Sequence, residues 1–85
     1  MGSPLDNTEI INILIEEIRE TVPELEGQPI SASDSMVDLG VNSIERSEVI
    51  LAAMERLDLK IPMVQLHGPK NIQELADLLL VKSAG

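Results

Sequence analysis

Cysteine and the aromatic residues Phe, Tyr and Trp are all absent from this 85-residue chain. Without cysteine, neither a disulfide framework nor a thiolate metal site can form. Without aromatic side chains, the chain lacks the flat surfaces on which nucleic-acid bases stack. These absences argue against a disulfide-stabilised scaffold and against a domain that recognises bases or sugars by stacking.

Basic charge is scarce as well. Six Lys and Arg residues stand against fifteen Asp and Glu residues, which gives a formal net charge of -9. Such a surface repels nucleic-acid phosphates and anionic membranes and attracts basic patches on other proteins. We therefore expect neither a nucleic-acid nor a membrane partner. The charge alone is equally consistent with a role in solubility only.

Long hydrophobic runs are missing. No apolar segment approaches the roughly 20 residues that span a bilayer, and the N-terminus lacks the basic region and apolar core of a signal peptide. A cytoplasmic location is the resulting expectation. The length suits one small domain, which we place at residues 5–82, with residues 1–4 and 83–85 as flexible termini. We expect this domain to be a monomer.

Apolar residues recur at the three-and-four spacing of a buried helix face in three segments, at about residues 6–22, 43–57 and 72–81. The expected faces are Ile11, Leu14, Ile18 and Val22 in the first segment, Ile50, Ala53, Met54 and Leu57 in the second, and Ile72, Leu75, Leu78 and Leu79 in the third. A short helical turn is expected at residues 63–66, and no segment alternates like a strand. The predicted fold is an all-α four-helix bundle, with three main helices and one short one.

Capping residues support these helix starts. Asp6, Asn42 and Asn71 are good N-caps, and each is followed three residues later by Glu, which is the spacing of a capping box. Pro23 and Pro62 prevent the first and second helices from continuing. The helix boundaries are thus predicted from two independent signals.

The connection between the first two long helices, residues 23–41, is unusually long for a compact domain. We expect its apolar residues Ile30, Met36, Val37 and Leu39 to hold it against the core. Ser35 begins a short motif with capping-box spacing, which predicts a helical turn at residues 35–39.

One serine has the setting of a modification site. If Asn42 is the N-cap, Ser43 is the first residue of the helix, and its hydroxyl projects outward. Free N–H groups and the positive end of the helix dipole favour an anion at that point. Gly40 allows a close approach to the helix start. The arrangement suits attachment of a group through phosphate, although an Asn-Ser pair also begins many ordinary helices.

The stretch DLGVNSI (residues 38–44) resembles the motif of acyl carrier proteins, in which Gly is followed two residues later by Asp and then by the modified Ser. The resemblance runs from the first helix to Leu79. It implies the acyl-carrier-protein fold and a 4′-phosphopantetheine arm on Ser43, installed from coenzyme A by a separate phosphopantetheinyl transferase. Asn42 stands where most carriers have Asp. It caps a helix equally well, but any contact that needs a carboxylate there would be lost.

Two segments, NSIER (residues 42–46) and NIQELADL (residues 71–78), are similar to the donor carriers of bacterial polyketide β-branching cassettes, which serve antibiotic biosynthesis. That resemblance implies four partners: the transferase, an acyltransferase that loads malonyl, a decarboxylating ketosynthase-like enzyme, and a 3-hydroxy-3-methylglutaryl (HMG) synthase-like enzyme that receives acetyl. Two alternatives stay open. One is a carrier for ordinary chain extension or for amino acids; the other is an unmodified acidic interaction protein. The sequence also leaves open whether the chain is free-standing or part of a larger synthase.

The remaining polar residues suggest no chemistry, so we predict no catalytic residue, no metal site and no enzyme activity. His67 lacks a neighbouring nucleophile or orienting group and is interpreted as an ordinary loop residue, with contact to the arm or a partner as the alternative. Glu16 and Glu17 are interpreted as solvated acids. Ile44 is either an exposed docking residue or partly buried, and Arg46 is either a partner contact or a plain surface charge.

Overall fold

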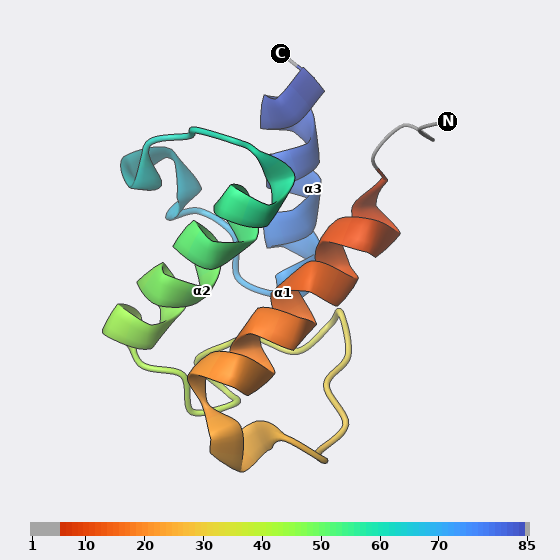
Figure 1. Cartoon of the computed structure of the whole chain (residues 1–85), viewed down its shortest axis with the longest axis vertical. Helices are drawn as coiled ribbons and strands as arrows, with labels where there is room; N and C mark the ends of the chain where they lie inside the picture. The colour runs from red at the N-terminus through yellow and green to blue at the C-terminus, as the bar shows by residue number, and fades with distance from the viewer. Residues whose placement is uncertain (1–5, 85) are drawn as a thin grey trace.

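The structure, a computed structural model, describes residues 6–84, so the expected flexible segment at residues 1–4 lies outside it. The chain forms α1 (Asn7–Thr21), η1 (Pro23–Leu25), α2 (Ser43–Leu57), η2 (Met63–Leu66) and α3 (Ile72–Ala84) (Figure 1). Residues 6–84 contain no strand, and none of their helices is long and apolar enough to cross a membrane. The all-α prediction is confirmed, with the short fourth helix present as the 3-10 turn η2.

The predicted caps begin the helices. Asp6 accepts a hydrogen bond from the N–H of Glu9 at 2.9 Å at the start of α1. Asn71 accepts one from the N–H of Glu74 at 2.7 Å at the start of α3. The Glu74 carboxylate reaches one residue further back than a capping box requires and accepts from the N–H of Lys70 at 2.9 Å. These bonds satisfy N–H groups that a helix start leaves without partners.

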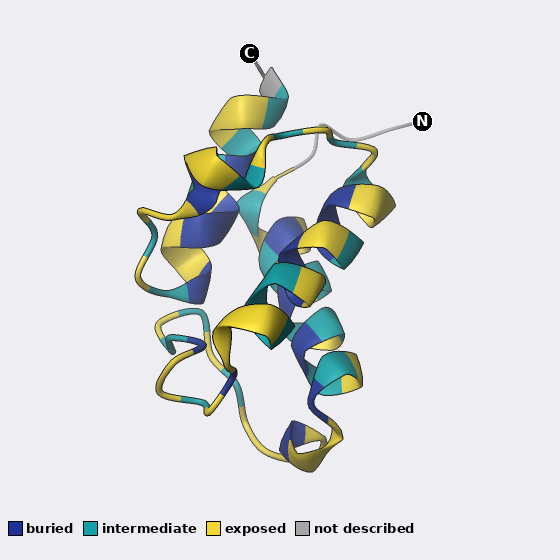
Figure 2. Ribbon diagram, turned by 90° about the vertical axis from the view of Figure 1, so that its left-hand side faces the viewer, coloured by how far each residue is buried: buried dark blue, intermediate teal, exposed yellow. Residues whose placement is uncertain are grey.

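The core lies where α1 packs against both α2 and α3, and buried residues line the facing sides of the three helices (Figure 2). Among residues 6–83, sixteen buried apolar side chains form it, and most of the expected faces are confirmed. In α1 the prediction was wrong by one position, because Ile10 is fully buried and Ile11 only partly. Residues 10, 14 and 18 lie four apart and form one row along the helix, whereas residue 11 is turned about 100° away from residue 10.

Similar exchanges occur in the other helices. Val49 and Ala76 are buried, while Leu57 and Leu78 are only partly buried against the core. The third helix also continues to Ala84, three residues beyond its predicted end.

The long connection between α1 and α2 is attached to the core, but not by every residue expected. Met36 is buried, and Ile30 and Leu39 pack partly buried against the core, whereas Val37 is 77% exposed. The Val37 prediction was wrong because residues 36–40 form a tight turn in which Met36 points inward and its neighbour outward. Ser35 Oγ accepts from the N–H of Asp38 at 3.0 Å, as a cap should.

Glycine is needed at position 40 for its backbone conformation. Gly40 has φ +87°, in the left-handed region that favours glycine. A Cβ atom at that position would meet nothing within 4 Å. The close approach predicted from the sequence is therefore absent, and the turn geometry is the reason for the glycine.

The connection between α1 and α2 also covers the start of α3. The carbonyl oxygen of Asp34 accepts from the N–H of Ile72 at 3.0 Å, and that of Ala32 accepts from the N–H of Gln73 at 2.8 Å. Two donors that the first turn of α3 cannot use internally are thereby satisfied. This places the residues preceding α2 beside the start of α3.

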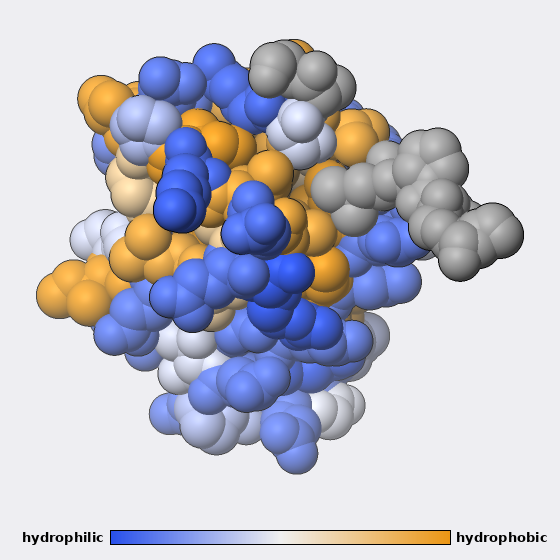
Figure 3. Space-filling model, turned by 45° about the horizontal axis from the view of Figure 1, so that its top comes forward, coloured by the Kyte–Doolittle hydropathy of each residue, from blue (hydrophilic) through white to orange (hydrophobic). Residues whose placement is uncertain are grey.

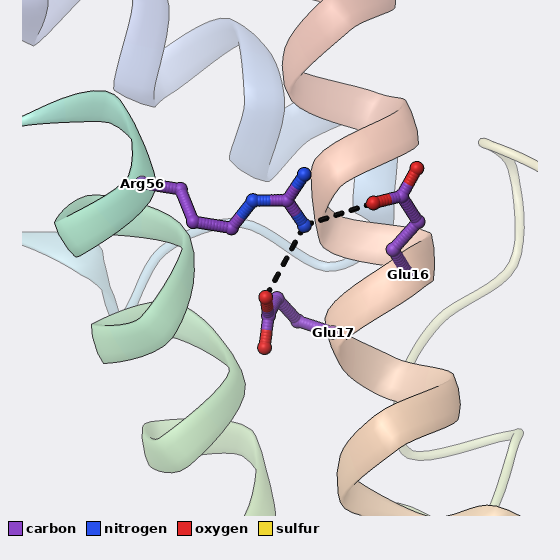
Figure 4. Close-up of polar contacts among 3 residues, drawn as sticks. All are labelled: Glu16, Glu17 and Arg56. Atoms are coloured by element: carbon purple, nitrogen blue, oxygen red, sulfur yellow. Dashed lines mark hydrogen bonds and ion pairs between the residues drawn. The ribbon is translucent and has the colours of Figure 1, made fainter.

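Glu16 and Glu17 are not the simple solvated acids that the sequence suggested. Arg56 of α2 donates to Glu16 at 2.9 Å and to Glu17 at 3.2 Å, so the ion pairs join α1 to α2 (Figure 4). The side chain of Glu17 is only 13% exposed. The hydrogen bonds that Arg56 donates to Glu16 and, second in effect, to Glu17 raise the pKa of Arg56 above its usual value, so the guanidinium stays charged throughout the physiological range.

Candidate functional site

Ser43 is exposed and is the first residue of α2, as predicted. A full capping box holds the helix start: Asn42 accepts from the N–H of Glu45 at 2.7 Å, and Glu45 accepts from the N–H of Asn42 at 3.1 Å. The N–H of Arg46 bonds to the carbonyl oxygen of Asn42 at 2.8 Å. The N–H groups of Ser43 and Ile44 lie before the first intrahelical bond, so they remain as donors beside the Ser43 hydroxyl.

A half-open cavity of about 490 Å³ adjoins Ser43. Its walls come from the turn before α2, the first turns of α2, the segment between η2 and α3, and the start of α3. Side chains of several kinds line it, among them Met36, Ser47, Arg46, His67, Lys70 and Leu75. The covering of α3 by the long connection explains why segments so far apart in sequence meet here.

Arg46 has a contact that neither sequence interpretation anticipated. One of its Nη atoms donates to the carbonyl oxygen of Leu66 at 3.0 Å, and the side chain is partly buried. The bond fastens the end of η2 to the first turns of α2, one helical turn beyond Ser43. Arg46 therefore helps to shape the cavity.

For His67 and Ile44, the sequence left contact with a partner open as one of two interpretations. His67 follows η2 as an exposed loop residue, which agrees with its ordinary interpretation, and it also lines the cavity with Ser43. Ile44 is 73% exposed, so it is not partly buried, and its side chain is accessible to a partner. Val64 of η2 is 74% exposed. In Figure 3, hydrophobic side chains reach the surface on the left, the side on which α2 and η2 lie in Figure 1.

Sequence reasoning missed Lys70 and Ser47 as neighbours of Ser43. Ser47 is four residues beyond Ser43 and so lies one turn further along α2, a spacing that would have revealed it. Lys70 lies 27 positions away in sequence, and only the path of the chain after η2 brings it to the cavity. No one-dimensional pattern signals that approach.

The surroundings of Ser43 fit a phosphate-linked group. The hydroxyl is exposed, two backbone N–H groups stand beside it, and the adjoining cavity has basic residues but no Asp or Glu in its lining. A phosphodiester formed there would be an anion at a favourable helix terminus. Within residues 6–84, no group of three or more His, Cys, Asp or Glu side chains is placed to hold a metal ion.

Comparison with known sequences identifies the class of protein. The sequence model of the phosphopantetheine attachment site matches residues 12–79. The chain therefore belongs to the phosphopantetheine-binding family, that of the acyl carrier proteins. It is a carrier with covalent phosphopantetheine as its cofactor, and it is not an enzyme.

Two members of that family are similar to this chain over most of its length. The polyketide biosynthesis acyl-carrier-protein AcpK of Bacillus subtilis is 44% identical over 78 residues, which cover 92% of this chain and 95% of that protein. A chain in the crystal structure of the curacin-pathway HMG synthase in complex with acetyl donor-ACP is 42% identical, with a TM-score of 0.87. That match covers 92% of this chain and 100% of the other, so the matched chain is of carrier size.

Proposed function

We propose that Ser43 bears the 4′-phosphopantetheine arm and that the chain donates acetyl to an HMG synthase-like enzyme in polyketide β-branching. The observation that carries the first part is the exposed Ser43 hydroxyl at the start of α2, beside free N–H groups and a cavity lined with basic residues. The second part rests on the relative found in complex with an HMG synthase, whose whole length matches 92% of this chain.

Loading is a phosphoryl-type transfer catalysed by a separate phosphopantetheinyl transferase. Ser43 Oγ forms a bond to the phosphorus that bears the pantetheine of coenzyme A, the pyrophosphate bond breaks, 3′,5′-ADP leaves, and the hydroxyl proton goes to a base on the transferase. The bound arm then supplies the thiol that holds an acyl group as a thioester. Because this loading needs coenzyme A and a transferase, we also propose a cytoplasmic location.

The chain's own residues position the arm and meet the partner. Asn42 and Glu45 stabilise the start of α2 through the capping box and so hold the backbone at the proposed attachment point in the helix. Ile44 offers an exposed apolar contact directly beside that point. Once a partner has docked, tethering makes delivery effectively intramolecular. Weak and brief docking is therefore enough for transfer.

The partners act in sequence in this proposal. An acyltransferase loads malonyl, a ketosynthase-like enzyme decarboxylates it to acetyl, and the HMG synthase-like enzyme takes the acetyl group. We place the carrier domain at residues 5–82 and propose that it acts as a monomer. The family match at residues 12–79 lies within those bounds.

Intact-mass measurement tests the attachment residue. The wild-type chain, incubated with coenzyme A and a broad-specificity phosphopantetheinyl transferase, should gain the mass of one phosphopantetheine. Ser43→Ala should gain none. Ser47→Ala is the matched control, because Ser47 lines the same cavity one turn further along α2, and it should load normally. Loading of folded Ser43→Ala would refute the assignment, and no loading of the wild type would favour an unmodified interaction protein.

A transfer assay separates the donor role from ordinary chain extension. The carrier bearing isotopically labelled acetyl is mixed either with a β-branching HMG synthase or with a chain-extending ketosynthase. The donor role predicts that label moves to the synthase at least about tenfold faster, a difference of about 1.4 kcal/mol in transition-state free energy. Faster transfer to the ketosynthase would support the extension carrier instead.

A further inference from the structure

The cavity beside Ser43 has the opposite charge to the molecule as a whole. Arg46 and Lys70, two of the six Lys and Arg residues, line it together with His67, the single histidine. None of the fifteen acidic residues does. A chain with a net charge of -9 therefore presents its attachment point next to a local concentration of basic groups. Such a site attracts an anion.

The tethered arm can bring two anions to this place: its phosphodiester and, in the malonyl form, a carboxylate at its far end. The phosphodiester is bonded to Ser43 and has the free N–H groups of the α2 start beside it. His67 and Lys70, by contrast, belong to the segment between η2 and α3. A half-open cavity of about 490 Å³ is in the range of small-molecule sites, about 300–1,000 Å³, and is larger than a phosphate needs.

We propose that this cavity binds the carboxylate of a malonyl group carried on the arm. The inference rests on the proposed function, because it needs both the arm on Ser43 and its malonyl loading. His67 and Lys70 are exposed and carry donors free to turn toward the cavity. Arg46 uses one Nη atom for Leu66 and keeps further N–H donors. Charge-assisted hydrogen bonds to a carboxylate are about twice as strong as neutral ones.

This binding would make the carrier sensitive to the state of its cargo. Decarboxylation breaks the bond to the carboxyl carbon, which leaves as carbon dioxide, and a proton takes its place on the methylene carbon. The product, acetyl, is neutral and no longer matches the basic lining. The malonyl form is therefore held against the carrier, and the acetyl form is free to enter the next partner.

The test uses four forms of the isotope-labelled carrier: apo, holo, and holo bearing acetyl or malonyl through an amide that does not hydrolyse. Nuclear magnetic resonance of the His67 and Lys70 side chains is the readout. We expect these resonances to shift in the malonyl form alone and to return toward their holo positions in high salt. Intact mass first establishes loading at Ser43, so failure of the proposed function is detected separately, and the inference would then fall with it.

Variants identify the groups responsible. Because His67→Gln with Lys70→Gln removes the two reporting side chains, the resonances of the arm are followed instead. They should differ between the malonyl and acetyl forms of the wild type, and the double variant should abolish that malonyl-specific shift. Lys60→Gln removes a lysine that lines a different groove, with Leu59 and Pro62, and should retain that shift. Arg46 is left unchanged because it holds η2. Equal spectra for the malonyl and acetyl forms would overturn the proposal. The proposal would also be overturned if the resonances shifted between the apo and holo forms and shifted no further in the malonyl form. That result would mean that the cavity binds the phosphodiester.

Discussion

At the residue scale, two hydrogen bonds involving Asn42 start the helix that carries Ser43. Replacing Asn42 by Ala removes the acceptor for the Glu45 N–H and should lower the free energy of unfolding by about 1 kcal/mol. Asn42→Asp caps equally well and should change it little. Urea unfolding measures both variants. An Asn42→Ala variant as stable as the wild type would mean that the capping box contributes little to the stability of α2.

Gly40 offers a second test at this scale, because its φ of +87° is unfavourable for a residue with a Cβ atom. Gly40→Ala should reduce stability by about 1–2 kcal/mol. Gly68→Ala is the matched control. Its Cβ atom would also meet nothing within 4 Å, and its backbone is outside the left-handed region. Thermal unfolding of the two variants would contradict this account if they lost equal stability.

What the sequence could reveal about single residues depended on distance along the chain. The capping roles of Asn42 and Asn71 were predictable, since each involves a residue three positions away. The bond from Arg46 to Leu66 spans 20 positions, and the approach of Lys70 to Ser43 spans 27. Nothing local encodes either contact, so the position of Ser43 at the start of α2 was predictable from the sequence and the cavity beside it was not.

At the scale of elements, α1 is the helix whose face is buried from two sides. Ile10→Ala should cost about 2–5 kcal/mol of unfolding free energy, because it empties a fully buried position. Ile11→Ala makes the same chemical change at a partly buried position and should cost clearly less. Urea unfolding of the pair tests the corrected face directly. A larger loss of unfolding free energy for Ile11→Ala would support the buried face that was expected from the sequence.

The ion pairs between α1 and α2 predict a salt-dependent contribution. Arg56→Gln should lower the melting temperature slightly in low salt and less in high salt, because the guanidinium is well exposed and its charge is screened. Lys82→Gln changes the net charge equally at a side chain that forms no ion pair within residues 6–84, and it serves as the control. A loss that is independent of salt would mean that Arg56 acts through packing of its stem.

The raised pKa of Arg56 also determines the pH behaviour of this contact. A pKa raised on folding gives stability that is present below the unfolded value and is lost only as pH rises through the folded one. Both values lie far in the alkaline range, so Arg56 itself adds no pH dependence near neutrality. The prediction that Glu16 and Glu17 are solvated failed because two adjacent acids on one helix do not reveal which neighbouring helix faces them.

Helix boundaries, too, were predicted correctly where a nearby residue determines them and wrongly where none does. The second helix was predicted at residues 43–57 and spans Ser43–Leu57, because a cap begins it and its apolar pattern ends before Pro62. The third helix has no such stop in sequence after Val81 and continues to Ala84. The direction of the Val37 side chain depends on the turn at residues 36–40, which apolar character alone does not specify.

At the scale of the whole molecule, the arrangement of the helices explains where the site lies. The first helix packs against both others, whereas α2 and α3 contact each other little (Figure 1). The space between the starts of α2 and α3 is bordered instead by the segment between η2 and α3 and by the turn before α2. A cavity remains there beside Ser43. The fold thus places Ser43 at a gap between elements and keeps the core intact.

The net charge of -9 leads to a prediction about the encounter with partner enzymes. Long-range attraction to a basic partner surface raises association rates by about 10–10³-fold, and salt removes most of that gain. Transfer of acetyl to an HMG synthase should therefore slow by at least about tenfold between low salt and 1 M salt, where the Debye length falls to about 3 Å. Ile44→Ala should weaken docking at every salt concentration without changing the slope, because the lost contact is apolar. Sucrose at matched viscosity controls for slower diffusion. Transfer rates that do not depend on ionic strength would mean that the acidic surface serves solubility alone and that apolar contacts around Ser43 select the partner.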